Sequence, residues 1–170
     1  MLRFLTKFGM RLLLGVCLAL GLSSVPAAAQ GYNSTGLMLK GAWPTGELDE
    51  TQDFGLGLSL VTRSRIGDQG RLWFHGQGSY LNFPGSELQL PSSTENYPDA
   101  EIWGISLGVM VGVSDRIFVG VEGGYFFGDE HSWGMTPFVS IIRNNLEIML
   151  EYKALGISTW YGVSVGYYLF

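Results

Sequence analysis

The sequence has a single cysteine, few charged residues and few long apolar runs, and each shortage excludes a class of protein. Its one cysteine, Cys17, cannot form a disulfide within the chain, so a domain held together by internal disulfides is excluded. Ten basic residues stand against fifteen acidic ones, and no basic patch of the kind that binds nucleic acid is present. No apolar run reaches the roughly 18 residues that indicate a membrane-spanning helix.

The N-terminus has the three parts of a secretory signal peptide. A positive segment comes first, with Arg3, Lys7 and Arg11. The apolar run Leu12 to Leu22 follows, and Ala27-Ala28-Ala29 offers a cleavage site of small residues. We therefore expect residues 1–29 to be a signal peptide and residues 30–170 to be the mature domain. A retained N-terminal anchor is the alternative, but the run is shorter than the roughly 20 residues that span a bilayer.

The expected mature domain has no cysteine, because Cys17 lies inside the apolar run of the signal. Acylation of Cys17, as in a lipoprotein, is not expected, since Val16 precedes it where a small residue is needed. An exported domain without disulfides needs another source of stability. A membrane provides one, because every backbone polar group within it must be paired in a closed structure.

The chain is rich in glycine and aromatic residues, and apolar residues alternate with small or polar ones in eight segments. The segments cover residues 35–43, 54–60, 72–82, 103–113, 117–127, 133–141, 146–153 and 161–170. In the last segment the apolar face carries Tyr161, Val163, Val165, Tyr167 and Leu169. Its opposite face carries Gly162, Ser164, Gly166 and Tyr168. This pattern predicts eight strands, although Pro137 is an awkward residue inside one of them.

The connections between these segments alternate in length and differ in charge. The odd connections are 44–53, 84–100, 128–132 and 154–158, and the even ones are 64–70, 114–116 and 143–145. We expect 84–100 to be a mobile loop. Acidic residues gather in or beside the odd connections: Glu47, Asp49, Glu50, Asp53, Glu87, Glu95, Asp99, Glu101, Asp129 and Glu130. Basic residues gather at the even ones: Arg63, Arg65, Arg71, Arg116 and Arg143. Solvation of charge in any loop is the alternative explanation.

Over residues 31–170 this pattern resembles the small eight-stranded outer-membrane barrels of the OmpA membrane domain and OmpX type. The resemblance implies an all-β, eight-stranded antiparallel transmembrane up-and-down β-barrel. It also implies a monomer in the outer membrane of a Gram-negative bacterium, in contact with lipid and lipopolysaccharide. In that family the barrel-assembly machinery reads a terminal aromatic residue and apolar residues at alternate positions before it. Tyr168 and Phe170 fit this C-terminal signal, whereas Gly166, Ser164 and Gly162 do not. Either a bulge shifts the last turn or Phe170 points inward.

Aromatic residues cluster near the expected strand ends, as they do where a barrel crosses the two faces of a membrane. Those near the outer ends are Trp43, Trp103, Tyr125, Phe127, Trp133, Tyr152 and Trp160. Those near the inner ends are Tyr32, Phe118, Tyr167, Tyr168 and Phe170. A soluble β-sandwich or lipocalin is the alternative. It fits poorly, because the face opposite the apolar one is mostly glycine and serine, too small to solubilise a surface.

The other face of the strands carries a few charged residues, which we expect to form a polar network inside the barrel. They are Lys40, Glu122, Glu147 and Glu151, accompanied by His75 and Gln77. An eight-stranded barrel is just wide enough for its own side chains to fill it, and buried carboxylates need partners. Lys40 is the expected internal cation. A narrow polar conduit is the alternative to a structural network.

No catalytic, cofactor or metal motif is present, so we expect no enzyme activity and no cofactor. His131-Ser132 invites comparison with the lipid A deacylases, but adjacent strand residues point to opposite faces and the His-x-Ser spacing of those enzymes is absent. Three functions stay open: a non-enzymatic barrel with an envelope-structural or surface-contact role, a small transport barrel, and a lipid A-modifying hydrolase. The acidic outer connections could also bind divalent cations, with simple solvation as the alternative.

Overall fold

The computed structural model describes residues 33–67, 71–90, 93–129, 131–156 and 158–169. These residues belong to one compact unit, Tyr32–Phe170. The expected signal peptide lies outside the described residues, as do Tyr32 and Phe170.

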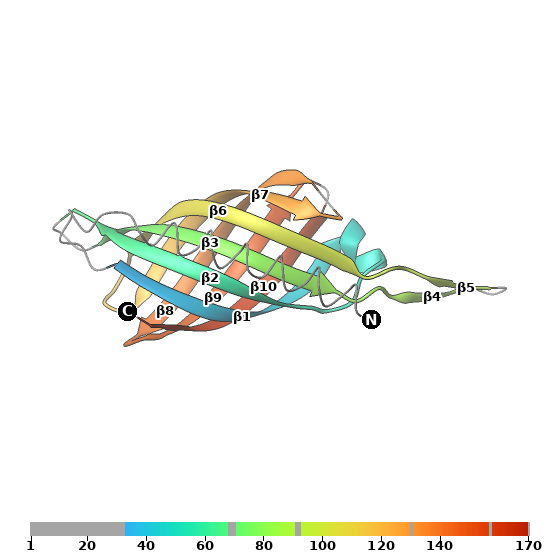
Figure 1. Cartoon of the computed structure of the whole chain (residues 1–170), viewed down its shortest axis with the longest axis horizontal. Coiled ribbons are helices and arrows are strands. Elements are labelled where there is room, and N and C mark those ends of the chain that lie inside the picture. The colour runs from blue at the N-terminus through green and yellow to red at the C-terminus, as the bar shows by residue number, and fades with distance from the viewer. Residues whose placement is uncertain (1–32, 68–70, 91–92, 130, 157, 170) are drawn as a thin grey trace, which may run out of the picture. The chain divides into compact units, whose positions relative to one another are not determined.

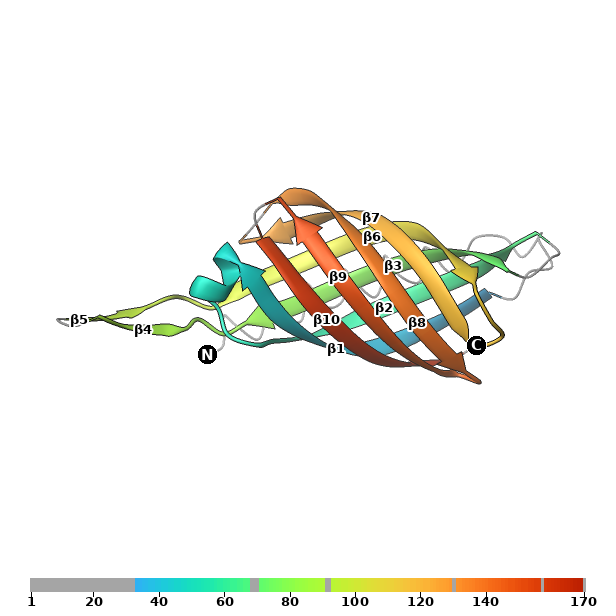
Figure 2. The ribbon, with the colours of Figure 1, turned by 180° about the vertical axis from the view of Figure 1, so that it is seen from behind.

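The described chain folds into a closed barrel of eight antiparallel strands (Figures 1 and 2). The strands are β1 (Asn33–Gly46), β2 (Gly55–Ile66), β3 (Leu72–Phe83), β6 (Ala100–Gly112), β7 (Ile117–Gly128), β8 (Ser132–Arg143), β9 (Leu146–Leu155) and β10 (Ser158–Tyr168). Each strand pairs with its neighbour along the chain, and β1 closes the barrel on β10. The eight-stranded fold expected from the alternation is confirmed.

Alternation within each strand sends apolar side chains outward and small or polar ones inward. Leu39 is 67 % exposed, whereas its neighbour Lys40 is 2 % exposed. Leu107 and Val109 of β6 are likewise exposed on the outside. Ser106, which lies between the exposed Ile105 and Leu107, is buried. A soluble barrel would place its charged residues outside and its leucines inside. This barrel is inverted in that sense, which suits a lipid environment.

The two ends of the barrel differ, and we call them the turn end and the loop end. The turn end carries the tight connections at 113–116 and 144–145, the second of which contains Asn144 with φ 56°. The loop end carries the 3-10 helix η1 (Glu47–Glu50) and a ribbon of two strands, β4 (Glu87–Leu90) and β5 (Ser93–Asn96). Among the described residues, no helix is long and apolar enough to cross a membrane.

The segment 84–100 is not the plain loop that its composition suggests, because β4 and β5 pair within it. The ribbon extends from the loop end, away from the turn end (Figure 1). Its base is tied to the connection after η1 by a bridge between Gln52 and Gly85. The Gln52 side-chain amide also donates a hydrogen bond to the Pro98 carbonyl at 3.2 Å.

Pro137 lies inside β8 with its ring on the outer surface of the barrel. The pairing of β8 with β9 includes Met135 with Ala154 and Phe138 with Glu151, but not the two positions between them. A proline has no N–H to give to the ladder, which explains the interruption. The strand continues because its other edge still pairs Pro137 with Val121 of β7.

Candidate functional site

The interior of the barrel is the candidate site, because the inward side chains of all eight strands meet there. Buried apolar residues form two clusters. The first, which we call the outer plug, contains Ala42, Leu48, Leu81, Phe83, Ile102, Phe126, Leu155 and Trp160. The second, which we call the inner cluster, contains Met38, Val61, Met110, Phe138, Met149 and Tyr168. The outer plug lies at the loop end, and Leu48 of η1 reaches into it.

Polar side chains occupy the level between these two clusters. On β1, Lys40 lies between Met38 of the inner cluster and Ala42 of the outer plug. On β9, Glu151 and Lys153 stand in the corresponding position. All of these polar groups are buried, and in such a setting an unpaired charge is costly. Their partners therefore decide whether the interior is stable.

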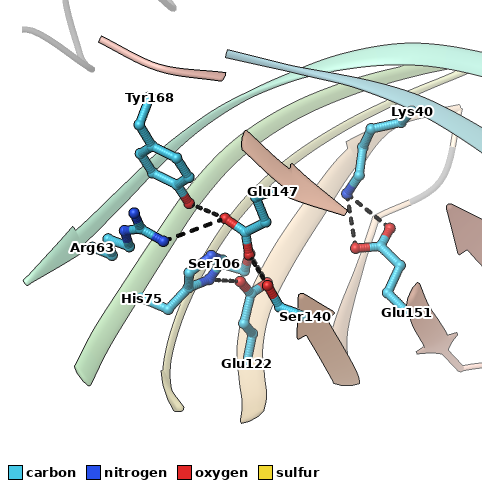
Figure 3. Close-up of polar contacts among 9 residues, drawn as sticks. All are labelled: Lys40, Arg63, His75, Ser106, Glu122, Ser140, Glu147, Glu151 and Tyr168. Atoms are coloured by element: carbon cyan, nitrogen blue, oxygen red, sulfur yellow. Dashed lines mark hydrogen bonds and ion pairs between the residues drawn. The ribbon is translucent and has the colours of Figure 1, made fainter. Parts of the chain in front are cut away.

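Lys40 and Glu151 form one buried ion pair (Figure 3). The Lys40 ammonium lies 2.8 Å from Oε1 and 2.9 Å from Oε2 of Glu151. Lys40 is on β1 and Glu151 on β9, so the pair crosses the inner face of β10, which lies between them. It passes over Gly162, where a Cβ would lie 2.7 Å from Cγ of Glu151. Glycine at this position makes room for the pair.

Glu122 on β7 joins β3 and β6 through a second polar group (Figure 3). Its carboxylate contacts Nδ1 of His75 and accepts a hydrogen bond from the Ser106 hydroxyl at 2.7 Å. The carboxylate thus lies between the serine and the histidine. Both residues contact Glu122, and no hydrogen bond joins the Ser106 hydroxyl to the His75 ring. This order is unsuited to a catalytic triad, in which the base takes the proton of the nucleophile.

Glu147 on β9 is the centre of a third group, near the turn end (Figure 3). It accepts hydrogen bonds from the Ser140 and Tyr168 hydroxyls. The Arg63 guanidinium lies 4.0 Å from the same carboxylate and 3.8 Å above the centre of the Tyr168 ring. Nε of Arg63 also donates to the Ser34 hydroxyl at 2.7 Å. This group connects strands on both sides of the β1–β10 closure.

The four residues expected to form the interior network are therefore all inside, but Lys40 is not the only cation with them. Arg63, expected at a turn, is buried within β2, because its alternate neighbours Ser59 and Val61 also face inward. Lys153 is fully buried too, and its ammonium lies 4.6 Å from the centre of the Phe126 ring and 5.8 Å from that of Trp160. The alternation of inward and outward positions along β2 and β9 indicates that both cations face inward. Three cations thus offset three buried carboxylates.

Several interior polar atoms have no hydrogen-bond partner among the described residues. They belong to Ser59, His75, Gln77, Thr136, Lys153 and Ser164. Lys153 has the two aromatic rings in place of an anion contact. The orphaned atom of Thr136 is its side-chain hydroxyl, which points into the barrel beside Pro137. Nε1 of Trp160 in the outer plug likewise has no hydrogen-bond partner in the described part of the chain, so orphaned groups occur both beside the charges and in the plug.

The aromatic residues expected at the membrane interfaces divide into two sets. Trp43, Tyr125, Trp133 and Tyr167 are exposed on the outer surface, and Trp103 and Tyr152 are partly covered by Tyr80 and Tyr161. Trp160, expected with the outer set, is instead fully buried in the outer plug. Phe118, expected with the inner set, packs from inside against Trp73, the ring centres being 6.3 Å apart. Both follow the parity of their strands.

The end of β10 places Tyr168 inside the barrel, so it is not an interfacial residue as expected. Leu169 points outward with 62 % exposure, and its N–H donates to the Thr35 carbonyl at 2.9 Å. The pairing of β10 with β1 runs without a break from Ser158 to Tyr168, so no bulge shifts this stretch. The direction of Phe170 lies outside the described residues.

No second site with catalytic or metal-binding character emerges from the described residues. His131 is exposed, and the Ser132 hydroxyl is buried without a hydrogen-bond partner in the described part of the chain, so the two do not form a nucleophile–base pair. Within the same residues, no group of three or more His, Cys, Asp or Glu side chains could hold a metal ion.

No protein-family model matches the chain, and no curated protein matches its sequence. Its fold does match solved structures. The crystal structure of Ail, the attachment invasion locus protein of Yersinia pestis, matches with a TM-score of 0.52 and 11 % identity, over 82 % of this chain and 99 % of Ail. The outer membrane protein Ail in a phospholipid bilayer nanodisc matches with a TM-score of 0.52 and 13 % identity, over 81 % and 100 %.

A de novo designed transmembrane β-barrel also matches, with a TM-score of 0.52 and 12 % identity, over 80 % of this chain and 95 % of the design. Ail has further been solved in complex with the heparin analogue sucrose octasulfate. At these identities the likeness concerns the fold. The chain has the closed eight-stranded antiparallel barrel of these membrane proteins, and the resemblance to small outer-membrane barrels is confirmed at that level.

Proposed function

We propose that this protein is a non-enzymatic outer-membrane barrel of a Gram-negative bacterium, with a closed interior and an envelope-structural or surface-contact role. Residues 1–29 direct export and are removed, and residues 30–170 insert into the outer membrane. The barrel-assembly machinery reads the C-terminal signal that includes Tyr168 and Phe170. The loop end faces the outside, because outer-membrane barrels have longer extracellular loops and shorter periplasmic turns.

The exposed apolar surface supports the membrane assignment. Outward positions carry leucine, isoleucine and valine on every strand of the barrel, among them Leu39, Leu58, Val109 and Ile148. A soluble protein rarely exposes apolar patches larger than a few hundred Å². The exposed Trp43, Tyr125 and Trp133 near the loop end suit the headgroup region, where amphipathic aromatic rings are stabilised.

The observation that carries the non-conducting role is the filled interior. Phe83, Phe126 and Trp160 are almost completely buried at the loop end, and Leu48 of η1 packs with them. Phe83 and Trp160 meet with ring centres 5.5 Å apart. Such a plug leaves the central charges without a polar route to the outside. The transport alternative therefore needs a rearrangement of large side chains, whereas the closed barrel needs none.

The surface-contact role rests on the loop end. Its exposed acidic side chains are Glu47, Asp49, Glu50, Asp53, Asp99 and Asp129. Exposed basic side chains, within the described residues, all lie at the turn end. A heparin-like polyanion, such as the analogue bound to Ail, would be repelled here. We propose that this surface instead contacts cationic or cation-bridged groups, including divalent ions shared with lipopolysaccharide phosphates.

The arrangement of His, Ser and Glu side chains supports the non-enzymatic part of the proposal. Near the loop end, the Ser132 hydroxyl has no hydrogen-bond partner within the described residues, and the Ser106–Glu122–His75 group is buried inside the barrel. Incubation of the folded protein with lipopolysaccharide tests this point. No fatty acid should be released, and release that is lost in Ser132→Ala would favour the hydrolase.

The conductance of the folded protein in planar lipid bilayers tests the closed interior. Folding is checked first by heat-modifiable gel migration, in which an intact barrel runs differently before and after boiling. The wild-type protein should insert without discrete current steps. A protein in which Trp160 is changed to alanine provides the sensitive comparison, because it shortens the largest buried side chain of the plug. Solute-dependent discrete openings of the wild type would overturn the closed-barrel role.

A further inference from the structure

Exposed charge is sorted by sign between the two ends of the barrel. The exposed basic side chains that the structure describes are Arg71, Arg116 and Arg143, and all three lie at the turn end. The exposed acidic ones lie at the loop end, with Asp115 as the exception. None of the three guanidinium groups has an ion-pair partner among the described residues. All three side chains are exposed, so an external anion can reach them.

These three residues, which we call the arginine arc, follow one another around the rim of the barrel. The Arg71 carbonyl accepts a hydrogen bond from Gly112 at the end of β6, at 2.7 Å. The Arg116 carbonyl accepts one from Ile142 near the end of β8, at 2.8 Å. Arg143 is the last residue of β8. Because β3, β6, β7 and β8 are consecutive in the barrel, the arc follows one continuous stretch of the rim.

Lipid-facing side chains lie directly beside the arc. A surface pocket of about 460 Å³ is lined by Ser114, Asp115, Arg116, Ile117 and Ile141. The two isoleucines are 42 % and 50 % exposed and are paired across β7 and β8. The lining of this shallow pocket therefore includes an arginine beside two apolar side chains of the membrane-facing surface. A ligand that fits both parts has an anionic head and an apolar chain.

We propose that the arginine arc binds the headgroups of anionic phospholipids in the periplasmic leaflet of the membrane. This inference rests on the proposed function, which places the turn end at that leaflet. The planar guanidinium group donates two parallel hydrogen bonds to a phosphate, and the acyl chains run along Ile117 and Ile141. Asp115 opposes binding at Arg116, but one carboxylate stands against three guanidinium groups. A basic side chain near an anionic membrane surface strengthens binding to that surface by about fivefold.

Lipid selectivity in vesicles of phosphatidylcholine and phosphatidylglycerol tests the proposal. Spin-labelled versions of both lipids report which one is enriched at the folded barrel. The wild type should enrich phosphatidylglycerol by about twofold or more, and R71Q/R116Q/R143Q should lose the preference. The matched variant R71K/R116K/R143K keeps the charge and should retain part of it. Asp115→Asn should strengthen it.

A triple glutamine variant that folds and enriches phosphatidylglycerol as well as the wild type does would overturn the inference. If that variant also lost binding to isolated peptidoglycan, the arc would be assigned to the cell wall. A protein that does not insert into vesicles at all contradicts the proposed function itself. Heat-modifiable migration separates that failure from a lack of lipid preference.

Discussion

The Lys40 ammonium lies 2.8 Å from the Glu151 carboxylate, and the pair spans the inner face of the strand that closes the barrel. Both side chains are about 1 % exposed, so neither charge is solvated by bulk water. Serving as each other's partner, they connect β1, the first strand, with β9, the strand before the last. The ion pair therefore reinforces the closure between the two ends of the sheet.

Breaking this pair should destabilise the barrel more than removing both partners. Lys40→Met leaves Glu151 as a buried charge without its nearest cation and should cost about 3–5 kcal/mol in the free energy of unfolding. The double variant K40M/E151L should recover much of that loss, because it removes both charges of the pair. Urea unfolding in lipid vesicles measures all three proteins. Equal losses in the single and double variants would argue against a mutual pairing.

A side chain at position 162 should destabilise the barrel, because the ion pair passes over Gly162. In Gly162→Ala the new Cβ would lie 2.7 Å from Cγ of Glu151, and the overpacking should cost about 1–3 kcal/mol in the free energy of unfolding. Gly123 on the lipid-facing surface is the matched control, since a Cβ there meets nothing within 4 Å. Gly123→Ala should leave the unfolding midpoint nearly unchanged. A similar loss at both positions would show that the effect comes from the strand backbone alone.

The hydroxyl groups of two neighbouring tyrosines of β10 should contribute differently to the free energy of unfolding. Tyr168 points inward and donates to Glu147, whereas Tyr167 is 55 % exposed on the outer surface. Tyr168→Phe should lower the free energy of unfolding by about 1–3 kcal/mol, because it removes a hydrogen bond to a buried carboxylate. Tyr167→Phe should change it by less than about 0.5 kcal/mol. If the order were reversed, the inward orientation of Tyr168 would be wrong.

The outer plug should contribute to stability through packing. Phe83 is fully buried against Trp160, and Phe83→Ala should lower the free energy of unfolding by about 3–5 kcal/mol through lost contacts and the cavity left behind. Phe54, 41 % exposed beside Trp43, is the control for an aromatic ring on the outside. Its change to alanine should cost clearly less in detergent-solubilised protein. Equal costs would contradict a tightly packed plug.

The fold could be predicted because a barrel in lipid needs a strict alternation along each strand. The exposure of Leu39 beside the burial of Lys40 is the local form of that rule. Interior positions of Glu122, Glu147 and Glu151 followed from the same parity. Trp160 and Arg63 obey the same alternation and face inward, although their nearness to strand ends suggests a membrane interface and a turn.

Partners inside the barrel could not be predicted, because they depend on register and on the stagger between strands. Nothing in the sequence says that Glu151 selects Lys40 and leaves Lys153 against Phe126. The alternation of apolar and polar residues does not predict the β4–β5 ribbon either, because its strands are short and lie outside the closed barrel. These features require the three-dimensional arrangement of the chain.

The location of Leu107 in the membrane tests the central claim most directly. The expected mature chain has no cysteine, so Leu107→Cys carries a single site for a fluorescent label on the face that is 50 % exposed. In vesicles, brominated lipid should quench the label strongly, and a membrane-impermeant thiol reagent should not reach the unlabelled cysteine. Rapid reaction of that cysteine from water, without quenching by lipid, would contradict a barrel that turns its apolar face to the membrane.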